Sequence, residues 1–461
     1  MSRAPRPVGH LEQTPASLPV VAVVSILAGA AAGLVGAGFR LALDQADEFR
    51  NWAIARLHAA LGTSFVSSAA GLLLIVTACA LAAMIAAWMV RRFAPFASGS
   101  GIPHVESVLV QELPMAPYRL IPVKFVGGVL AIGSGMALGR EGPSVQMGAT
   151  VAHFVGRLFR RNAPDGLVLL ASGAGAGLAT AFNAPIAGAI FVLEELVRRF
   201  DTRITIATFG ASTGAIAVAR IFLGQKPDFA IQLNPYPDIA TVPLDLLLGA
   251  IAGLFAVAYN KTVLGMLAGT DRINRWPVEL RALLIGATVG LIAWFGPSLV
   301  GGGDSITQRT LNGGDSLRWL VLVFSLRFVL GPLSYAARTP GGLFAPLLVL
   351  GAQLGLFFGI VSQYVFPEWA PDPRMLAVVG MAAFFTGVVR APLTGITLVT
   401  EMTGSFTLLL PMLAACFTAM LVPTLLRDEP IYDSLRLGTL QIQEKANRDA
   451  AAEIQATRSA Q

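Results

Sequence analysis

Long apolar windows almost free of charge constrain this chain more than any other feature. They begin near Leu18, Ser67, Leu167, Val242, Leu283, Leu317 and Leu343, with further ones after Met375 and Leu408. A helix needs about 20 apolar residues to cross the hydrocarbon of a bilayer. Of the 461 residues 55% are hydrophobic and 13% charged, and the mean hydropathy is +0.68, which excludes an ordinary soluble domain. The windows therefore predict an all-α polytopic membrane protein. The first window lacks the cleavage site of a signal peptide, so we expect a retained helix there.

Glycine and proline interrupt many of these windows. The chain has 48 glycines and 28 prolines, and many of them lie inside apolar stretches. Irregular backbone at membrane depth is tolerated only where protein buries it or where it lines a polar cavity, so we expect broken helices. Other glycines recur at a spacing of four that allows helices to pack closely. They are Gly29 and Gly33, Gly249 and Gly253, Gly286 and Gly290, and Gly351, Gly355 and Gly359.

The chain contains an internal repeat. Residues 27–39 (LAGAAAGLVGAGF) resemble residues 247–259 (LLGAIAGLFAVAY), and the segment 184–194 resembles 391–401. Proline, glycine and alanine of 143–149 are also matched in 346–352. These matches occur in the same order, and repeats of this kind in membrane proteins commonly hold the substrate site at their interface. The sequence alone does not fix the number of spans in each half.

The repeat divides the chain into four parts. We expect a flexible N-terminal arm over 1–16, a first membrane repeat over 17–230, a second over 240–437 and a short C-terminal tail over 438–461. The tail is too short for an appended regulatory domain.

A carboxylic acid lies inside one apolar region. Glu141 belongs to the run GREGP (139–143), which follows the apolar stretch 126–138. An ionised carboxylate at membrane depth costs about 2.5 kcal/mol or more, so such a residue is a functional candidate. The position of Glu141 therefore predicts a functional site.

Three segments share a pattern of glycine followed closely by proline and an apolar run. They are GSGIP (99–103), GREGP (139–143) and GGLFAP (341–346). Proline is favoured in the first turn of a helix, and the free amides of a helix start, with its dipole, form an anion site. Glycine allows the backbone to approach the anion closely. The three starts together predict an anion pathway.

These motifs carry a family resemblance. Together with AFNAPIAGAIFVLEE (181–195) and the late EPIYDSL (429–435), they resemble the CLC family of chloride channels and proton-coupled chloride transporters, in its prokaryotic form without C-terminal regulatory domains. The match runs from about residue 18 to 437. The resemblance implies two inverted-topology repeats with broken and re-entrant helices.

The resemblance also implies a chloride site. Its ligands would be the hydroxyls of Ser100 and Tyr432 and the backbone amides of Gly142, Leu343 and Phe344. Such donors suit chloride, because a full counter-charge would bind it too tightly for release. The alternatives are a helix-capping role for Ser100 and a membrane-interface anchor for Tyr432.

Two acids would move the protons. The resemblance implies that Glu141 is the external gate and that Glu195 is the internal proton acceptor, a position where channel members of the family usually lack an acid. Ionised, Glu141 would occupy the anion site; protonated, it would yield to chloride. The alternatives are a fixed salt bridge between Glu141 and Arg140, and a solvated acid at a helix end for Glu195. A buried pair of Glu106 and Lys124 is also expected.

The expected function is exchange of chloride for protons, with a passive chloride channel on the same scaffold as the alternative. An enzyme is not expected: GASTG (210–214) fits the hydrolase pattern GxSxG, but it lies in an apolar run without a preceding strand. No metal or cofactor motif occurs. Basic clusters such as 157–161 lack interleaved aromatics and favour a lipid surface over nucleic acid. The resemblance implies a homodimer in a prokaryotic inner membrane, and we expect both termini to be cytoplasmic.

Overall fold

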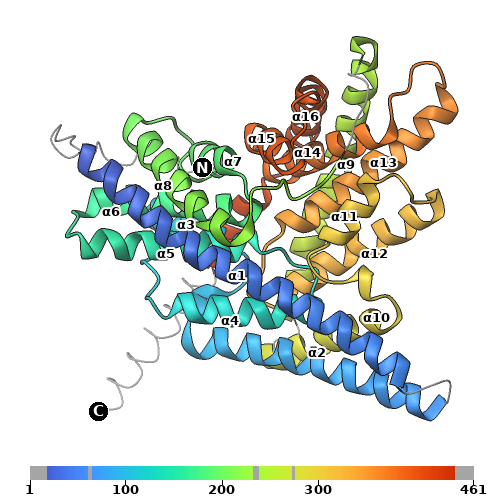
Figure 1. The fold of residues 1–461 in the computed structure, drawn as a ribbon, viewed down its shortest axis with the longest axis horizontal. Helices are drawn as coiled ribbons and strands as arrows, with labels where there is room; N and C mark the ends of the chain where they lie inside the picture. Colours follow the sequence, from blue (N-terminus) through green and yellow to red (C-terminus); the bar gives the residue numbers. More distant parts are fainter. Residues whose placement is uncertain (1–17, 61–64, 232–237, 273–275, 442–461) are drawn as a thin grey trace, which may run out of the picture.

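The computed structural model describes residues 18–60, 65–231, 238–272 and 276–441. The expected N-terminal arm (1–16) and all but the first residues of the expected tail lie outside the described residues. Within the described ranges the chain is helical, and only two isolated bridges interrupt this pattern (Figure 1). The prediction of an all-α protein is confirmed.

The helices fall into two series of eight. The first comprises α1 (Leu18–Ala60), α2 (Phe65–Phe93), α3 (Ile102–Leu109), α4 (Leu120–Gly133), α5 (Glu141–Leu158), α6 (Ala163–Phe182), α7 (Pro185–Phe191), which continues into the π-helical turn η3 (Val192–Leu196), and α8 (Thr202–Leu223). The second comprises α9 (Val242–Arg272), α10 (Val278–Phe295), α11 (Asp304–Leu311), α12 (Leu317–Ala336), α13 (Phe344–Val365), α14 (Pro373–Val389), α15 (Pro392–Thr403) and α16 (Leu409–Leu425). Residues 431–441 are also helical.

The two series pack in the same way. Helix α1 packs on α8 as α9 packs on α16, and α5 packs on α6 as α13 packs on α14. Figure 1 shows most of the first series on one side and most of the second on the other, with α1 crossing the face in front. Across the boundary, α2 packs on α10 and α7 on α15. The order and the contacts of the elements are thus duplicated along with the sequence.

Small residues allow this close packing. A Cβ added to Gly29 would lie 1.9 Å from the carbonyl oxygen of Ala211, and one added to Gly355 would lie 2.0 Å from that of Leu376. The backbones of α1 and α8, and of α13 and α14, therefore touch. The packing role expected of the glycines spaced by four is confirmed.

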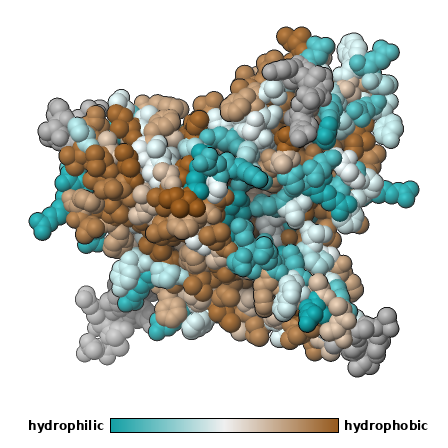
Figure 2. Space-filling model, viewed as in Figure 1, coloured by the Kyte–Doolittle hydropathy of each residue, from teal (hydrophilic) through white to brown (hydrophobic). Residues whose placement is uncertain are grey.

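The layout of the helices is that of a multi-pass membrane protein. Eight helices of the described chain are long and apolar enough to cross a bilayer. In the apolar windows of α6 and α13, 89% and 78% of the residues are buried, compared with 33% in α2. Helices α6 and α13 therefore form the interior, and α2 faces outward. Figure 2 shows broad apolar surface, with hydrophilic surface gathered in the middle of the face that α1 crosses.

Candidate anion and proton site

The three glycine–proline helix starts meet in the middle of the molecule. The amide of Gly99 donates to Thr339 O at 3.1 Å, and the amide of Gly341 donates to Gly99 O at 3.1 Å. Gly139 and Gly342 exchange both of their backbone hydrogen bonds, at 2.8 and 2.7 Å. Segments that lie about two hundred residues apart are thereby tied together, and the starts of α3, α5 and α13 share one site.

Glycine is required where these backbones meet. A Cβ on Gly142 would lie 2.4 Å from Ser100 Oγ, and one on Gly342 would lie 2.2 Å from Glu141 Oε1. Gly101, the N-cap of α3, has φ +87, which side chains rarely adopt. The glycines of the motifs therefore serve close approach to the site as well as the turns.

Glu141 is the first residue of α5 and is fully buried. Its Oε1 accepts a hydrogen bond of 2.6 Å from the amide of Phe344, the first residue of α13. Its Oε2 has no hydrogen-bond partner among the described residues. The starts of two helices from opposite halves thus converge on one carboxylate, and this carboxylate oxygen stands where a bound anion would meet the same amide.

Arg140 does not pair with Glu141. Its guanidinium donates to Asp304 at 2.8 Å, to Asp228 at 3.3 Å and to the carbonyl oxygen of Ala181 at 2.9 Å. The alternative of a fixed salt bridge between Arg140 and Glu141 is therefore wrong.

Ser100 and Tyr432 lie beside this position with free hydroxyls. Both side chains are fully buried, they lie close to each other, and neither hydroxyl has any other hydrogen-bond partner among the described residues. The ring of Tyr432 lies 5.8 Å from that of Phe344, centroid to centroid. Buried polar groups are usually paired, so two free hydroxyls mark a place for a hydrogen-bond acceptor.

The alternatives for these two residues do not fit the geometry. Ser100 does not cap α3, because Gly101 is the N-cap and no side chain caps the helix. Tyr432 is not at a membrane surface, since it is fully buried. The remaining expected ligands are the amides of Gly142 and Leu343, which lie in the first turn of α5 and at the N-cap of α13. Amides at such positions have no partner within the helix. Chloride binding by these groups stays a prediction.

Glu195 lies in the π-helical turn η3 and is buried, with 3% of its surface exposed. Its nearest cation is Arg198, whose Nη2 lies 3.8 Å from Oε1 and only 2.7 Å from Asp433. The alternative of a solvated acid is therefore wrong. Single π-helical turns are frequent at functional sites. Tyr432 lies within electrostatic range of both Glu195 and Glu141.

The expected pair of Glu106 and Lys124 does not form. Lys124 Nζ donates to the carbonyl oxygens of Ala97 and Gly99, at 3.0 and 2.7 Å. Glu106 has no hydrogen-bond partner among the described residues, and its electrostatic neighbours include Glu195. The buried lysine instead holds the loop that carries Ser100. Sequence reasoning noted Lys124 but assigned it the wrong partner.

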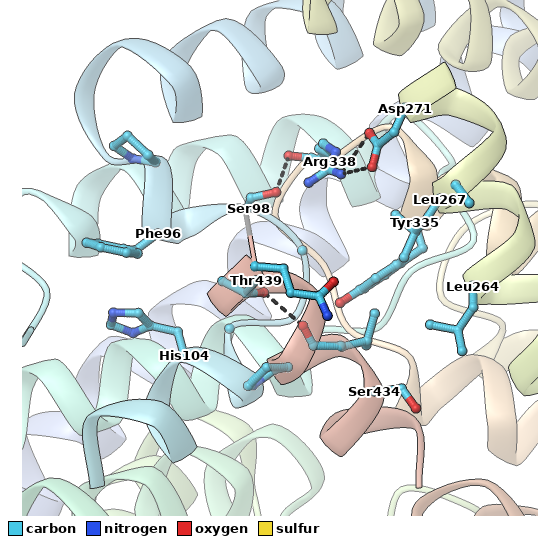
Figure 3. A pocket seen from close by; sticks show the side chains of 18 residues that line it. Phe96, Ser98, His104, Leu264, Leu267, Asp271, Tyr335, Arg338, Ser434 and Thr439 are labelled. Carbon is cyan, nitrogen blue, oxygen red and sulfur yellow. Dashed lines mark hydrogen bonds and ion pairs between the residues drawn. The ribbon is translucent and has the colours of Figure 1, made fainter. Parts of the chain in front are cut away.

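A cavity lies next to the segment that carries Ser100. It has a volume of about 600 Å³, and Gly99, Gly101 and Tyr335 line it next to Ser100. The hydroxyl of Tyr335 accepts a hydrogen bond from the amide of Ser100 at 3.4 Å. Figure 3 shows Arg338 paired with Asp271 at the edge of this cavity and the ring of Tyr335 directed into it. Tyr335 was missed in the sequence because it belongs to none of the motifs.

The hydrolase-like GASTG segment serves helix packing. A Cβ on Gly214 would lie 2.2 Å from the carbonyl oxygen of Ile26 in α1, and Ser212 is buried within α8. In the described part of the chain, no cluster of three histidine, cysteine or acidic side chains could hold a metal ion.

Fold and site together define a class of protein. The chain is a multi-pass helical membrane protein whose broken helices bring backbone amides and two hydroxyls around one buried carboxylate, that of Glu141. A family model described as voltage gated chloride channel matches residues 81–424. The chain belongs to this family.

Individual relatives cover nearly the whole chain. The H(+)/Cl(-) exchange transporter ClcA of Vibrio cholerae is 39% identical over 445 residues, which cover 95% of this chain and 93% of the relative. The protein of that name from Cronobacter sakazakii is also 39% identical, with coverages of 94% and 92%.

Solved structures share the fold. A slow cyanobacterial Cl-/H+ antiporter has a TM-score of 0.86 at 32% identity and covers 92% of this chain and 99% of its own. A eukaryotic CLC transporter with a TM-score of 0.75 and 24% identity covers 92% of this chain and 75% of its own, and it shows the fold alone. The resemblance to the CLC family is confirmed.

Proposed function

We propose that this protein exchanges chloride for protons across a bacterial membrane. The observation that carries the proposal is the position of the Glu141 carboxylate, which binds the first amide of α13 beside two unpaired hydroxyls. Relatives named as H(+)/Cl(-) exchange transporters cover 95% of the chain. Such exchange needs the carboxylate and chloride to compete for one position. A site that can hold either of them supplies this competition.

In this proposal Glu141 is the external gate. Ionised, its carboxylate takes the amide of Phe344 and excludes chloride, because two anions cannot share one helix start. Protonated, the acid loses its charge-assisted hydrogen bond, which is about twice as strong as a neutral one. Chloride then binds the amides of Phe344, Leu343 and Gly142 and the hydroxyls of Ser100 and Tyr432. One group thus links proton binding to chloride movement.

Glu195 is the proton acceptor on the other side. It lies beside Arg198 and Asp433, at the end of the α7–η3 unit, and chloride need not pass it to reach Ser100 through the cavity next to Tyr335. Protons and chloride therefore use separate routes on this side and meet at Glu141.

We also propose the assembly and the placement. Residues 17–230 and 240–437 are the two membrane repeats, and their inversion is supported by the starts of α5 and α13, which meet head to head. The protein is a homodimer in the bacterial inner membrane with cytoplasmic termini, as the resemblance implies. Cross-linking in native membranes and protease accessibility from each side test these statements.

The exchange is tested in reconstituted vesicles. A chloride gradient is imposed and the pH of the outer solution is recorded. We expect chloride efflux to drive proton uptake against a proton gradient. Glu141→Ala should conduct chloride without protons, and Glu195→Gln should stop proton movement while chloride still passes.

A matched control variant distinguishes the loss of the roles of Glu141 and Glu195 from a general loss of structure. Glu279→Gln removes an acid that pairs with Arg91 far from the site, and it should keep both fluxes. Chloride flux without any proton movement in the unmutated protein would support the passive channel and reject the exchanger.

A further inference from the structure

A charged cluster lies next to the proposed gate. Arg140, the N-cap residue of α5, meets Asp228 and Asp304, and Asp228 also accepts a hydrogen bond of 2.6 Å from Arg40 of α1. We call these four residues the arginine cluster. The side chain of Asp228 is 6% exposed, that of Arg140 11% and that of Asp304 49%. Asp228 is therefore the buried link between two arginines, and Asp304 is the exposed partner.

The loop between the two series fixes Asp228. The next amide, that of Phe229, donates to the carbonyl oxygen of Met402 in α15 at 2.9 Å. Ala230 exchanges two hydrogen bonds with the side chain of Gln308 in α11, at 3.0 and 2.9 Å. The carboxylate of Asp228 is thus held by contacts to the second series while it binds two arginines of the first.

The arginine cluster is balanced in charge, with two cations and two anions. Asp44 of α1 adds a third carboxylate within electrostatic range of both arginines. The phenols of Tyr259 and Tyr432, which are uncharged, are also within electrostatic range of Glu141, and Arg327 is within range of Tyr259. Arg140 is the cation next to Glu141 in the chain, and every hydrogen bond it makes is to other groups.

We propose that Asp228 is a positioning residue that holds Arg140 off the Glu141 carboxylate and thereby sets the pH at which the gate opens. The inference rests on the proposed exchange. If Arg140 were free to approach, it would stabilise the ionised acid, and the gate would need a higher proton concentration to open. Asp228 is buried and binds two arginines, so it resists the movement of Arg140 toward Glu141. An exposed ion pair would resist it less, because exposed pairs contribute little free energy.

The test measures chloride flux from vesicles against the pH of the outer solution. Asp228→Asn should move the midpoint of this dependence to lower pH by about 0.5 to 1 unit. Asp304→Asn should shift it in the same direction by less, because Asp304 is half exposed. Asp271→Asn, a carboxylate paired with Arg338 at the cavity on the other side, should leave the midpoint unchanged.

A double-mutant cycle separates positioning from a simple loss of negative charge. In the Arg140→Gln background, Asp228→Asn should no longer shift the midpoint, because the arginine adjacent to Glu141 in the chain is already absent and only Arg40 of α1 is released. A shift of equal size in both backgrounds would overturn the inference in favour of a bare field effect. If Asp228→Asn does not fold, the same cycle is run with Asp304→Asn.

The outcomes also distinguish the two proposals. An unchanged midpoint in Asp228→Asn, with coupled exchange intact, rejects the role of Asp228 and leaves the exchanger standing. An unmutated protein whose chloride flux does not depend on pH rejects both.

Discussion

At the scale of residues, the site is built from polar groups that do not find their hydrogen-bond partners within their own segment of the chain. Glu141 receives its hydrogen bond from the other half of the chain. The hydroxyls of Ser100 and Tyr432 remain unpaired. The motif predicted Glu141, because a carboxylate in an apolar run is costly. Its contact with Phe344 depends on the folded chain, since the sequence separates the two residues by about two hundred positions.

The buried Lys124 gives a prediction at this scale. Lys124→Met would leave the carbonyl oxygen of Ala97 unpaired in the interior and that of Gly99 with only the amide of Gly341, at a cost of about 1–3 kcal/mol for the unpaired group. We expect a lower thermal unfolding midpoint in detergent and weaker chloride binding in calorimetry, because the loop of Ser100 loosens. Lys261→Met, at an exposed position on α9, should change neither. Normal chloride affinity in Lys124→Met would contradict the role given to this lysine.

At the scale of elements, hydropathy predicted the long helices and the glycine–proline pattern predicted the start of the short helix α3, but neither predicted the short helix α11. The windows near Ser67, Leu167 and Leu283 correspond to α2, α6 and α10, because length and hydropathy mark a spanning helix. Helix α11 has eight residues and begins in the polar run GGGDS, where neither signal exists. It is nevertheless this helix that supplies Asp304 and Gln308 to the surroundings of Arg140.

Helix packing gives the second prediction. Gly355→Ala would place a Cβ about 2.0 Å from the carbonyl oxygen of Leu376, so α13 and α14 must separate. The start of α13 carries Phe344, and its shift should reduce chloride transport as well as stability. Gly265→Ala has nothing within 4 Å and should be tolerated. Purification yield, unfolding midpoint and chloride flux compare the two; equal behaviour would reject the packing argument.

At the scale of the whole molecule, the two halves hold each other through matched glutamates. Glu194, after α7, accepts hydrogen bonds from the amides of Leu393 and Thr394 at the start of α15, at 2.9 and 2.7 Å. Glu401, in the last turn of α15, accepts hydrogen bonds from the first amides of α7, at 3.1 and 2.8 Å. Helices α7 and α15 therefore run antiparallel, and each half caps a helix of the other. The two acids end the matched segments 184–194 and 391–401 of the internal repeat.

This reciprocal capping gives the third prediction. Glu194→Gln and Glu401→Gln should each lower stability by about 1–3 kcal/mol, because each replaces a carboxylate oxygen with an amide donor that faces another donor. Glu194→Gln should cost more, since Thr394 Oγ1 also donates to Glu194. Unfolding midpoints in detergent measure both, with Glu368→Gln, at an exposed position between α13 and α14, as the control. Equal midpoints in all three variants would show that the caps do not join the halves.

The sequence by itself determined the membrane environment, the class of fold, the repeat and the motifs of the candidate anion site. These are local properties, because hydropathy, glycine spacing and a proline after glycine act over a few neighbouring residues. Only the tertiary structure decided which groups meet: Phe344 with Glu141, Lys124 with the Ser100 loop, and Asp228 with Arg140. A hydrogen bond between distant segments leaves no periodic trace in the chain, and the partner of a buried charge is chosen by packing.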